Sequence, residues 1–233
     1  MTNRMFFALA GLALLLFQCA PGEPAADVQP NGGAKAVQVA AHEAVAEANY
    51  ADGLQLGEKA PDFSLKNIDG NMYSLADVKD ANGNTPKGYV VIFTCNTCPF
   101  AVAYEDRIVA LHKKTSAMGY PVVAIQPNDP AIKPDDGMEG MQRRAKEKGF
   151  SFLYLFDDGQ KVYPMYGATR TPEVYLLDAG HVLRYHGAID DNAQDAGAAT
   201  VNYVEKAIAA LEAGQSPDPA DVKAIGCTIK AAK

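Results

Sequence analysis

The sequence lacks the features that mark several functional classes. No block of lysine or arginine occurs along the chain, and 28 acidic residues outnumber 21 basic ones, giving a net charge of −7. This balance argues against nucleic acid as a partner, because such partners are bound through clustered positive charge. Beyond the N-terminal 20 residues there is no second long apolar run, so we expect no membrane span after that point. We also find no internal repeat.

Residues that bind metals are equally scarce. The four histidines show no paired spacing, so we interpret each as a surface or strand residue: His42, His112, His181 and His186. Cys95 and Cys98 form a single CxxC pair, which supplies two of the four ligands of a structural zinc site. Asp190-Asp191-Asn192 with Asp195 resembles a calcium loop only in part, because the ligand spacing and the closing glutamate are missing. The sequence therefore predicts no metal and no organic cofactor.

The first recognisable feature of the sequence is a hydrophobic leader at its N-terminus. In residues 1–19, Arg4 precedes an apolar run that is short for a membrane span, which is typical of a secretory signal peptide. The ending Leu16-Phe17-Gln18-Cys19 resembles a bacterial lipoprotein signal, although Gln18 replaces the usual small residue. A lipidated Cys19 and a plain cleaved leader both stay open. Either predicts an extracytoplasmic, periplasmic protein, with a lipid anchor as its one membrane attachment.

Composition divides the rest of the chain into three parts. Residues 20–52 are rich in Ala, Pro, Gly and Glu and bury too little apolar surface to fold, so we interpret them as a flexible tether. Residues 53–214 have the size and patterning of one domain. Residues 215–233 are expected to form a polar C-terminal tail.

Strand and helix patterns alternate within the domain. Short strand candidates at 62–65 and 72–75 flank Asp69-Gly70, a turn signal for an N-terminal β-hairpin. Apolar runs predict strands at 89–94, 120–126 and 152–156, and a later hairpin of 173–178 with 182–186. Helical patterns cover 99–118, 136–148, 160–166 and 200–213. This order predicts an α/β fold, with a mixed central sheet flanked by helices on both faces.

The CxxC pair lies where a buried strand ends and a helix begins. Pro99 suits the first helical turn, and open α/β sheets carry their sites at the carboxyl ends of strands. A thiol at a helix N-terminus faces unpaired N–H groups, which lower a cysteine pKa from about 8.5 into the range of roughly 3.5 to 7.5. Cys98 is therefore the predicted nucleophile and Cys95 its resolving partner. An inert disulfide or half a zinc site is the alternative interpretation.

Two further stretches bear on this site. Thr171-Pro172 directly precedes a strand, where a cis bond would place backbone groups beside the thiols, although an ordinary trans proline also fits. Cys227 lies beyond the last predicted helix. A resolving thiol that folds back on the site and a loosely packed structural cysteine both fit that position.

Together these motifs resemble the redoxins of the AhpC/TSA superfamily. LGEKAPDFSLKNIDGNMYSLAD resembles the opening of that superfamily, and a set of later motifs is similar to its peroxiredoxin-like group with a CxxC: FTCNTCPF, AYEDR, NDP, GATRTPEVYLLD, AIDD and IGCTIK. The resemblance covers residues 54–230. It implies a thioredoxin-like fold in which Thr171 and a cis Pro172 position the substrate, while Arg170 favours the thiolate.

The same resemblance places Cys98 at the position of the peroxidatic cysteine of peroxiredoxins, five residues after Phe93. Two positions depart from the peroxiredoxin pattern. Val91 stands where a proline is expected, and Cys95 stands where a threonine or serine is expected. These departures favour disulfide exchange over peroxide reduction.

The sequence thus predicts an extracytoplasmic thiol–disulfide oxidoreductase whose CxxC pair cycles between dithiol and disulfide. The implied partners are a disulfide or peroxide substrate, protein or small molecule, and an unidentified thiol reductant. A thiol-dependent peroxidase is the first alternative. The second, from a different class, is a copper(I)-binding assembly factor of thioredoxin fold, because soft thiolates suit Cu(I).

Overall fold

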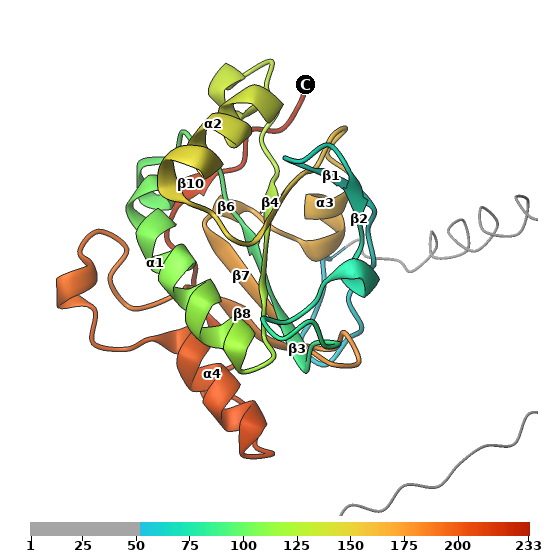
Figure 1. The fold of residues 1–233 in the computed structure, drawn as a ribbon. Coiled ribbons are helices and arrows are strands. Elements are labelled where there is room, and N and C mark those ends of the chain that lie inside the picture. Colours follow the sequence, from blue (N-terminus) through green and yellow to red (C-terminus); the bar gives the residue numbers. More distant parts are fainter. Residues whose placement is uncertain (1–51) are drawn as a thin grey trace, which may run out of the picture. The chain divides into compact units, whose positions relative to one another are not determined.

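The computed structural model describes residues 52–233, drawn in colour in Figure 1. The expected leader with Cys19, residues 20–51 of the expected tether, and His42 lie outside the described residues. Between residues 52 and 233, no helix combines the length and apolar character needed to cross a bilayer.

A mixed sheet of eight strands forms the centre of the domain, in the order β2-β1-β5-β4-β3-β7-β8-β9. Its strands are β1 (Leu65–Asn67), β2 (Met72–Tyr73), β3 (Gly88–Phe93), β4 (Val122–Gln126), β5 (Leu153–Phe156), β7 (Glu173–Asp178), β8 (Leu183–Gly187) and β9 (Asp221–Val222). Strands β3, β4 and β5 run parallel, whereas β7 is antiparallel to both β3 and β8. β3 lies in the middle and all six of its residues are buried, as its continuous apolar run predicts.

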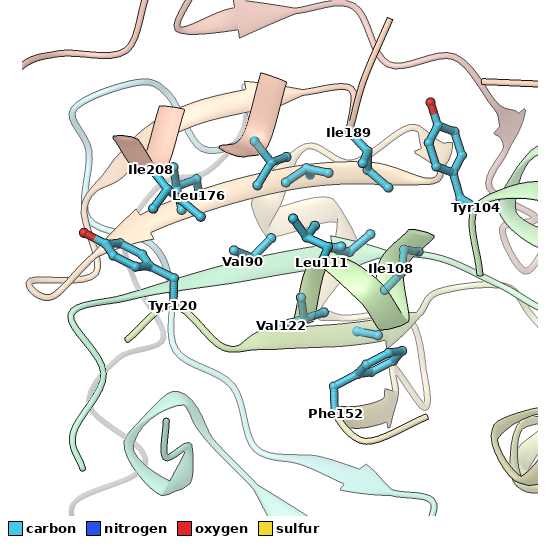
Figure 2. Close-up of a cluster of buried hydrophobic side chains, with 14 of the residues drawn as sticks. Val90, Tyr104, Ile108, Leu111, Tyr120, Val122, Phe152, Leu176, Ile189 and Ile208 are labelled. Carbon is cyan, nitrogen blue, oxygen red and sulfur yellow. The ribbon is translucent and has the colours of Figure 1, made fainter. Parts of the chain in front are cut away.

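Helices cover both faces of this sheet. They are α1 (Pro99–Ala117), α2 (Met138–Lys148), α3 (Val162–Tyr166) and α4 (Tyr203–Glu212), with short 3-10 turns η1 (Leu75–Asp77), η2 (Pro134–Asp136) and η3 (Ala196–Ala198). On one face, α1, α2 and α4 pack in a single apolar core, part of which Figure 2 shows around Ile108 and Val90. On the other face, α3 packs with the chain that precedes β2. The predicted thioredoxin-like α/β fold is confirmed, and β1 and β2 form the N-terminal hairpin.

Some boundaries differ from those predicted, for local reasons. β1 begins at Leu65 rather than Asp62, because the Asp62 carboxylate accepts hydrogen bonds from the backbone N–H groups of Phe63 and Leu75 and so shapes a turn. Asp136, expected to begin a helix, lies in η2, and α2 starts after Gly137.

The chain beyond α4, expected as a polar tail, carries two short strands. β9 pairs in parallel with β8. β10 (Cys227–Thr228) pairs antiparallel with β6 (Arg170–Thr171) in a separate two-stranded sheet. Strands of two residues are too short to show a hydrophobic period, so the sequence pattern gives no sign of them.

Candidate active site

The CxxC pair lies at the junction of β3 and α1, as predicted. Cys98 is the N-cap residue of α1 and Pro99 is its first helical residue. The Cys98 carbonyl accepts the hydrogen bond of the Val102 N–H at 2.9 Å, which closes the first helical turn. Cys95 and Cys98 are each only 3% exposed. Both sulfur atoms therefore lie in a site that excludes most water.

Thr171 contacts both sulfur atoms. Its Oγ1 lies 3.2 Å from Cys95 Sγ, and its carbonyl oxygen accepts a hydrogen bond from the Cys98 thiol at 3.2 Å. The Thr171–Pro172 peptide bond is cis, the isomer that the resemblance implies. Although Thr171 lies more than 70 residues along the chain from the pair, the fold makes it their neighbour.

The surroundings of Cys98 favour its thiolate. Hydrogen bonding from the Cys95 thiol is the largest cause, and together with the Cys227 thiol and the Ala101 backbone N–H it lowers the pKa of Cys98 to about 4 against the opposing effect of burial. When Cys98 ionises it loses its hydrogen bond to the Thr171 carbonyl, because a carbonyl oxygen can accept only from the neutral thiol. The arrangement provides one thiolate at the helix N-terminus.

Cys95 has the opposite character. Its interaction with Cys98, its burial and the nearby charge of Asp136 all raise the pKa of the Cys95 thiol. Cys95 therefore stays protonated and donates to Cys98. The two cysteines differ first because they share one hydrogen bond, in which Cys95 donates and the Cys98 thiolate accepts. The backbone N–H of Ala101 adds to the stabilisation of the Cys98 thiolate, and the charge of Asp136 adds to the cost of ionising Cys95.

Asp136 holds the loop between the two cysteines from beneath. It is 0% exposed and accepts hydrogen bonds from the Asn96 N–H, the Thr97 hydroxyl and the Asn128 side-chain amide, each at 2.8 Å. Sequence reasoning missed this residue, since it was assigned to a helix start. In the sequence, Asp135 and Asp136 both follow Pro134, and nothing in the local pattern shows which of the two carboxylates is buried.

Cys227 lies against the CxxC pair. In the β6–β10 pairing, Cys227 stands opposite Thr171, and its side chain packs with Cys95, Cys98 and Ala101. Burial, followed by its hydrogen bond and charge interaction with Cys98, raises the pKa of Cys227 to about 11. The sequence allows either a resolving thiol or a structural cysteine at this position, and in the structure the Cys227 side chain lies beside the sulfur of Cys98.

Arg170 and Glu173 shape the segment around Thr171. Arg170 donates from Nη1 to the carbonyl of Gly226 at 2.9 Å, so its guanidinium contacts the C-terminal segment. The Glu173 carboxylate accepts from the backbone N–H groups of Thr169 and Arg170 at 2.7 and 2.8 Å. Its other oxygen lies 2.8 Å from His186 Nε2. These bonds fix the chain on which Thr171 lies.

The remaining candidates take part in ordinary contacts. The His112 ring accepts the Val122 N–H at 3.1 Å, and the His181 ring packs edge-on against Tyr89. Asp190, considered for calcium, pairs with Arg107 at 2.8 Å and accepts the Tyr104 hydroxyl. Over the part of the chain that the structure describes, no cluster of three or more His, Cys, Asp or Glu side chains is arranged to hold a metal ion.

Comparison with known proteins identifies the family of the chain. A sequence model of the AhpC/TSA family matches residues 56–186. The structure of an uncharacterized conserved protein from Geobacillus kaustophilus is 34% identical and covers 77% of this chain and 93% of its own, with a TM-score of 0.70. A hypothetical protein from Sinorhizobium meliloti 1021 is 33% identical over 77% of this chain and 96% of its own, also with a TM-score of 0.70.

A more distant relative carries a functional name. The thiol-disulfide oxidoreductase ResA of Bacillus thuringiensis is 24% identical over 128 residues, which make up 54% of this chain. The match spans 65% of the length of that relative.

Proposed function

The chain belongs to the AhpC/TSA family, and from that premise we propose that it is an extracytoplasmic thiol–disulfide oxidoreductase in which Cys95 and Cys98 cycle between dithiol and disulfide. The observation that carries the proposal is the pair of buried sulfur atoms at the start of α1, one favoured as thiolate and the other its hydrogen-bond donor. A thiolate is the nucleophile of disulfide exchange, and a neighbouring thiol completes the reaction. The named relative supports the same class of activity.

The reaction passes two electrons from the protein to a substrate disulfide, RS–SR′. The Cys98 thiolate attacks one sulfur, forms a Cys98–S–R mixed disulfide and expels R′S⁻. Cys95 gives its proton to R′S⁻ and its sulfur then attacks Cys98 Sγ, so that RS⁻ leaves and the Cys95–Cys98 bond forms. A thiol reductant returns the pair to the dithiol by the reverse exchange.

Substrate positioning is assigned to the segment that borders the two sulfur atoms. Thr171 contacts both Cys95 and Cys98, so a substrate sulfur that reaches Cys98 must lie beside it. In the proposed site Pro172 forms the wall next to Thr171. Arg170 binds the Gly226 carbonyl next to Cys227, and we propose that its positive charge at this edge favours the thiolate.

The extracytoplasmic location rests on the leader, in which a basic residue precedes a short apolar run. The ending at Cys19 adds the proposal of a lipid anchor. Thiol chemistry of this kind outside the cytoplasm requires a reductant delivered to the same compartment. We therefore propose an extracytoplasmic dithiol as the reducing partner.

Peroxide reduction is the second candidate function, and the low pKa of Cys98 favours it. In a sulfenic acid cycle, Cys98 would attack a peroxide oxygen, release water or an alcohol, and be resolved by Cys95. The substitution of a thiol at Cys95 for the usual hydroxyl weighs against an efficient cycle. A copper(I)-binding assembly factor is the alternative from another class, because soft thiolates suit that ion.

Turnover of a small disulfide tests the proposal. The full chain carrying Cys19→Ser is compared with the same chain carrying Cys98→Ser, with dithiothreitol as reductant and oxidised glutathione as substrate. We expect the Cys98→Ser change to lower the rate at least about 100-fold, because the nucleophile is lost. Equal rates in the two chains would overturn the proposal. A Cu(I) competition assay would favour the copper(I)-binding assembly factor if Cys95→Ser and Cys98→Ser lost Cu(I) affinity alike while turnover was absent.

A further inference from the structure

Three sulfur atoms, from two distant parts of the chain, meet at the start of α1. Cys227 packs with Cys95 and Cys98, although it lies on the last strand of the domain. We propose that Cys227 is a second resolving thiol, which competes with Cys95 for a substrate adduct on Cys98 and forms a Cys98–Cys227 disulfide during turnover. This inference rests on the proposed function and adds a catalytic residue to it.

The backbone around Cys227 is held on both sides. Before it, the Gly226 carbonyl accepts the Arg170 guanidinium at 2.9 Å. After it, the Ile229 N–H donates to the Thr169 carbonyl at 3.0 Å. A Cβ atom on Gly226 would lie only 2.1 Å from the carbonyl oxygen of Thr171, so the strand approaches this closely because residue 226 is glycine.

The chain beyond Cys227 is fixed in turn. The Lys230 carbonyl accepts the Asp129 N–H and the Gln160 side-chain amide, both at 2.9 Å. The Lys230 N–H donates to Asn128 Oδ1 at 2.8 Å, and Asn128 also binds Asp136. The residue that orders the CxxC loop is thus connected to the segment that carries Cys227. Such anchoring fits a thiol held in register with Cys98 and does not fit a loosely packed structural cysteine.

The two partner thiols reach Cys98 from different elements. Cys95 comes from the loop after β3, is buried and has the Asp136 network beneath it. Cys227 comes from β10 and is partly exposed. A substrate held on Cys98 therefore has one buried thiol and one more accessible thiol beside it. The accessible thiol loses its proton to solvent or to a leaving thiolate more readily, because less burial opposes its charged form.

The step balances without a further reactant. After Cys98 has formed Cys98–S–R and released R′S⁻, the Cys227 thiol transfers its proton to R′S⁻. The Cys227 sulfur attacks Cys98 Sγ, the Cys98–S–R bond breaks, and RS⁻ leaves as the Cys98–Cys227 bond forms. Cys95 then attacks Cys98 Sγ and gives its proton to the displaced Cys227 thiolate, which leaves the Cys95–Cys98 disulfide and a Cys227 thiol.

Adduct trapping with oxidised glutathione tests this inference in the full chain carrying Cys19→Ser. In the Cys95→Ser variant we expect a Cys98–Cys227 disulfide in peptide mass mapping and little glutathione on Cys98. In the Cys95→Ser/Cys227→Ser variant the glutathione adduct should accumulate at least about tenfold more, because no thiol remains to expel it. A stable adduct on Cys98 in Cys95→Ser alone, with Cys227 free, would overturn the inference.

The Cys227→Ser variant shows whether a negative result contradicts only the role of Cys227 or the proposed oxidoreductase function as a whole. It retains Cys95 and Cys98, so it should still form the Cys95–Cys98 disulfide with oxidised glutathione. If it does, while Cys95→Ser retains its adduct, the role of Cys227 is wrong and the oxidoreductase stands. If it forms no such disulfide, the proposed function itself fails.

A glycine pair tests the geometry without removing a thiol. Gly226→Ala in the Cys95→Ser chain should slow closure of the Cys98–Cys227 disulfide at least about tenfold, because the added Cβ displaces β10 from Thr171. Gly197→Ala is the control, since the nearest atom to its Cβ is a side-chain oxygen of Asp195 at 3.3 Å. Equal closure rates in the two variants would contradict the inference.

Discussion

At the scale of single residues, the site depends on three thiols with different proton affinities. Cys98 lies at a helix N-terminus and, as a thiolate, accepts hydrogen bonds that Cys95 and Cys227 donate. The difference arises from position, since all three side chains have the same chemistry. These differences in protonation can be tested at Cys98 and at Asp136.

The first concerns alkylation of Cys98 by iodoacetamide as pH is lowered. A group whose pKa falls from about 9 to about 4 is ionised throughout the interval between those values, so Cys98 should react at an almost constant rate from pH 8 to pH 5 and lose reactivity near pH 4. Cys227, with a pKa raised to about 11, should react only as the pH becomes alkaline. Peptide mass mapping of the reduced chain gives both rates, and the unfolded chain provides the reference. Identical pH profiles for the three cysteines would refute the assignment.

The second prediction concerns the carboxylate beneath the CxxC loop. Asp136→Asn should destabilise the fold by about 1–3 kcal/mol, because an amide nitrogen replaces an acceptor that serves three donors. It should also lower the pKa of Cys95, since a negative charge that raises it is removed. Urea unfolding measures the first effect, and a pH titration of Cys95 in a Cys98→Ser background measures the second.

The adjacent Asp135 is the matched control for this change. Its carboxylate is 71% exposed and pairs with Arg143, which is also exposed. Asp135→Asn should change the free energy of unfolding by less than about 0.5 kcal/mol. Equal effects of the two substitutions would show that Asp136 does not hold the loop.

At the scale of elements, long patterns were predictable and short pairings were not. The apolar run of β3 and the helical spacing in α1 identify both elements in the sequence, and the CxxC site follows from their junction. β6, β9 and β10 have two residues each and exist because a partner backbone lies beside them. No local pattern encodes such a pairing.

The same reason explains which site residues were found. The position of Cys98 at the start of α1 was predictable because the residue directly precedes Pro99 and the helical pattern that follows it. Asp136 and Cys227 contact the CxxC segment from positions that are distant in sequence, so local patterns did not identify Asp136 and left two interpretations open for Cys227. Asp135 and Asp136 are identical in sequence terms, yet one is exposed and the other buried. Only the packing of η2 under the CxxC loop distinguishes them.

The third prediction concerns the element that carries Cys98. Ile108 of α1 is buried against the sheet in the core of Figure 2, so Ile108→Ala should destabilise the fold by about 2–5 kcal/mol through lost burial and a residual cavity. Lys113→Ala on the exposed side of the same helix should change stability by less than about 0.5 kcal/mol. Urea unfolding of both variants is the measurement. A similar small effect for both would mean that α1 is not anchored through this core.

At the scale of the whole molecule, the fold brings together four segments of the chain at one end of β3. The CxxC loop, the turn at Asp136 and the β6–β10 pair meet there, so the thiols are enclosed by parts of the chain that are far apart in sequence. The groups that these segments place around Cys98 determine whether its thiolate is better suited to disulfide exchange or to peroxide reduction. The polar groups that bind Cys98 are the thiols of Cys95 and Cys227, the Thr171 carbonyl and backbone N–H groups, whereas the Thr171 hydroxyl lies 3.2 Å from Cys95.

The last prediction concerns the choice between peroxide and disulfide. Peroxide cleavage requires a donor that stabilises the leaving oxygen, and thiols are weak donors compared with a hydroxyl. We therefore expect Cys98 to react faster with a small disulfide than with hydrogen peroxide, as measured by stopped-flow under pseudo-first-order conditions. Cys95→Thr should raise the peroxide rate about tenfold, equivalent to about 1.4 kcal/mol of transition-state stabilisation from one hydroxyl donor. Cys95→Val has the same shape without the hydroxyl and should show no such gain. If valine and threonine raised the rate alike, the effect would come from removing a thiol, and the absence of a hydroxyl would not be what limits peroxide reduction.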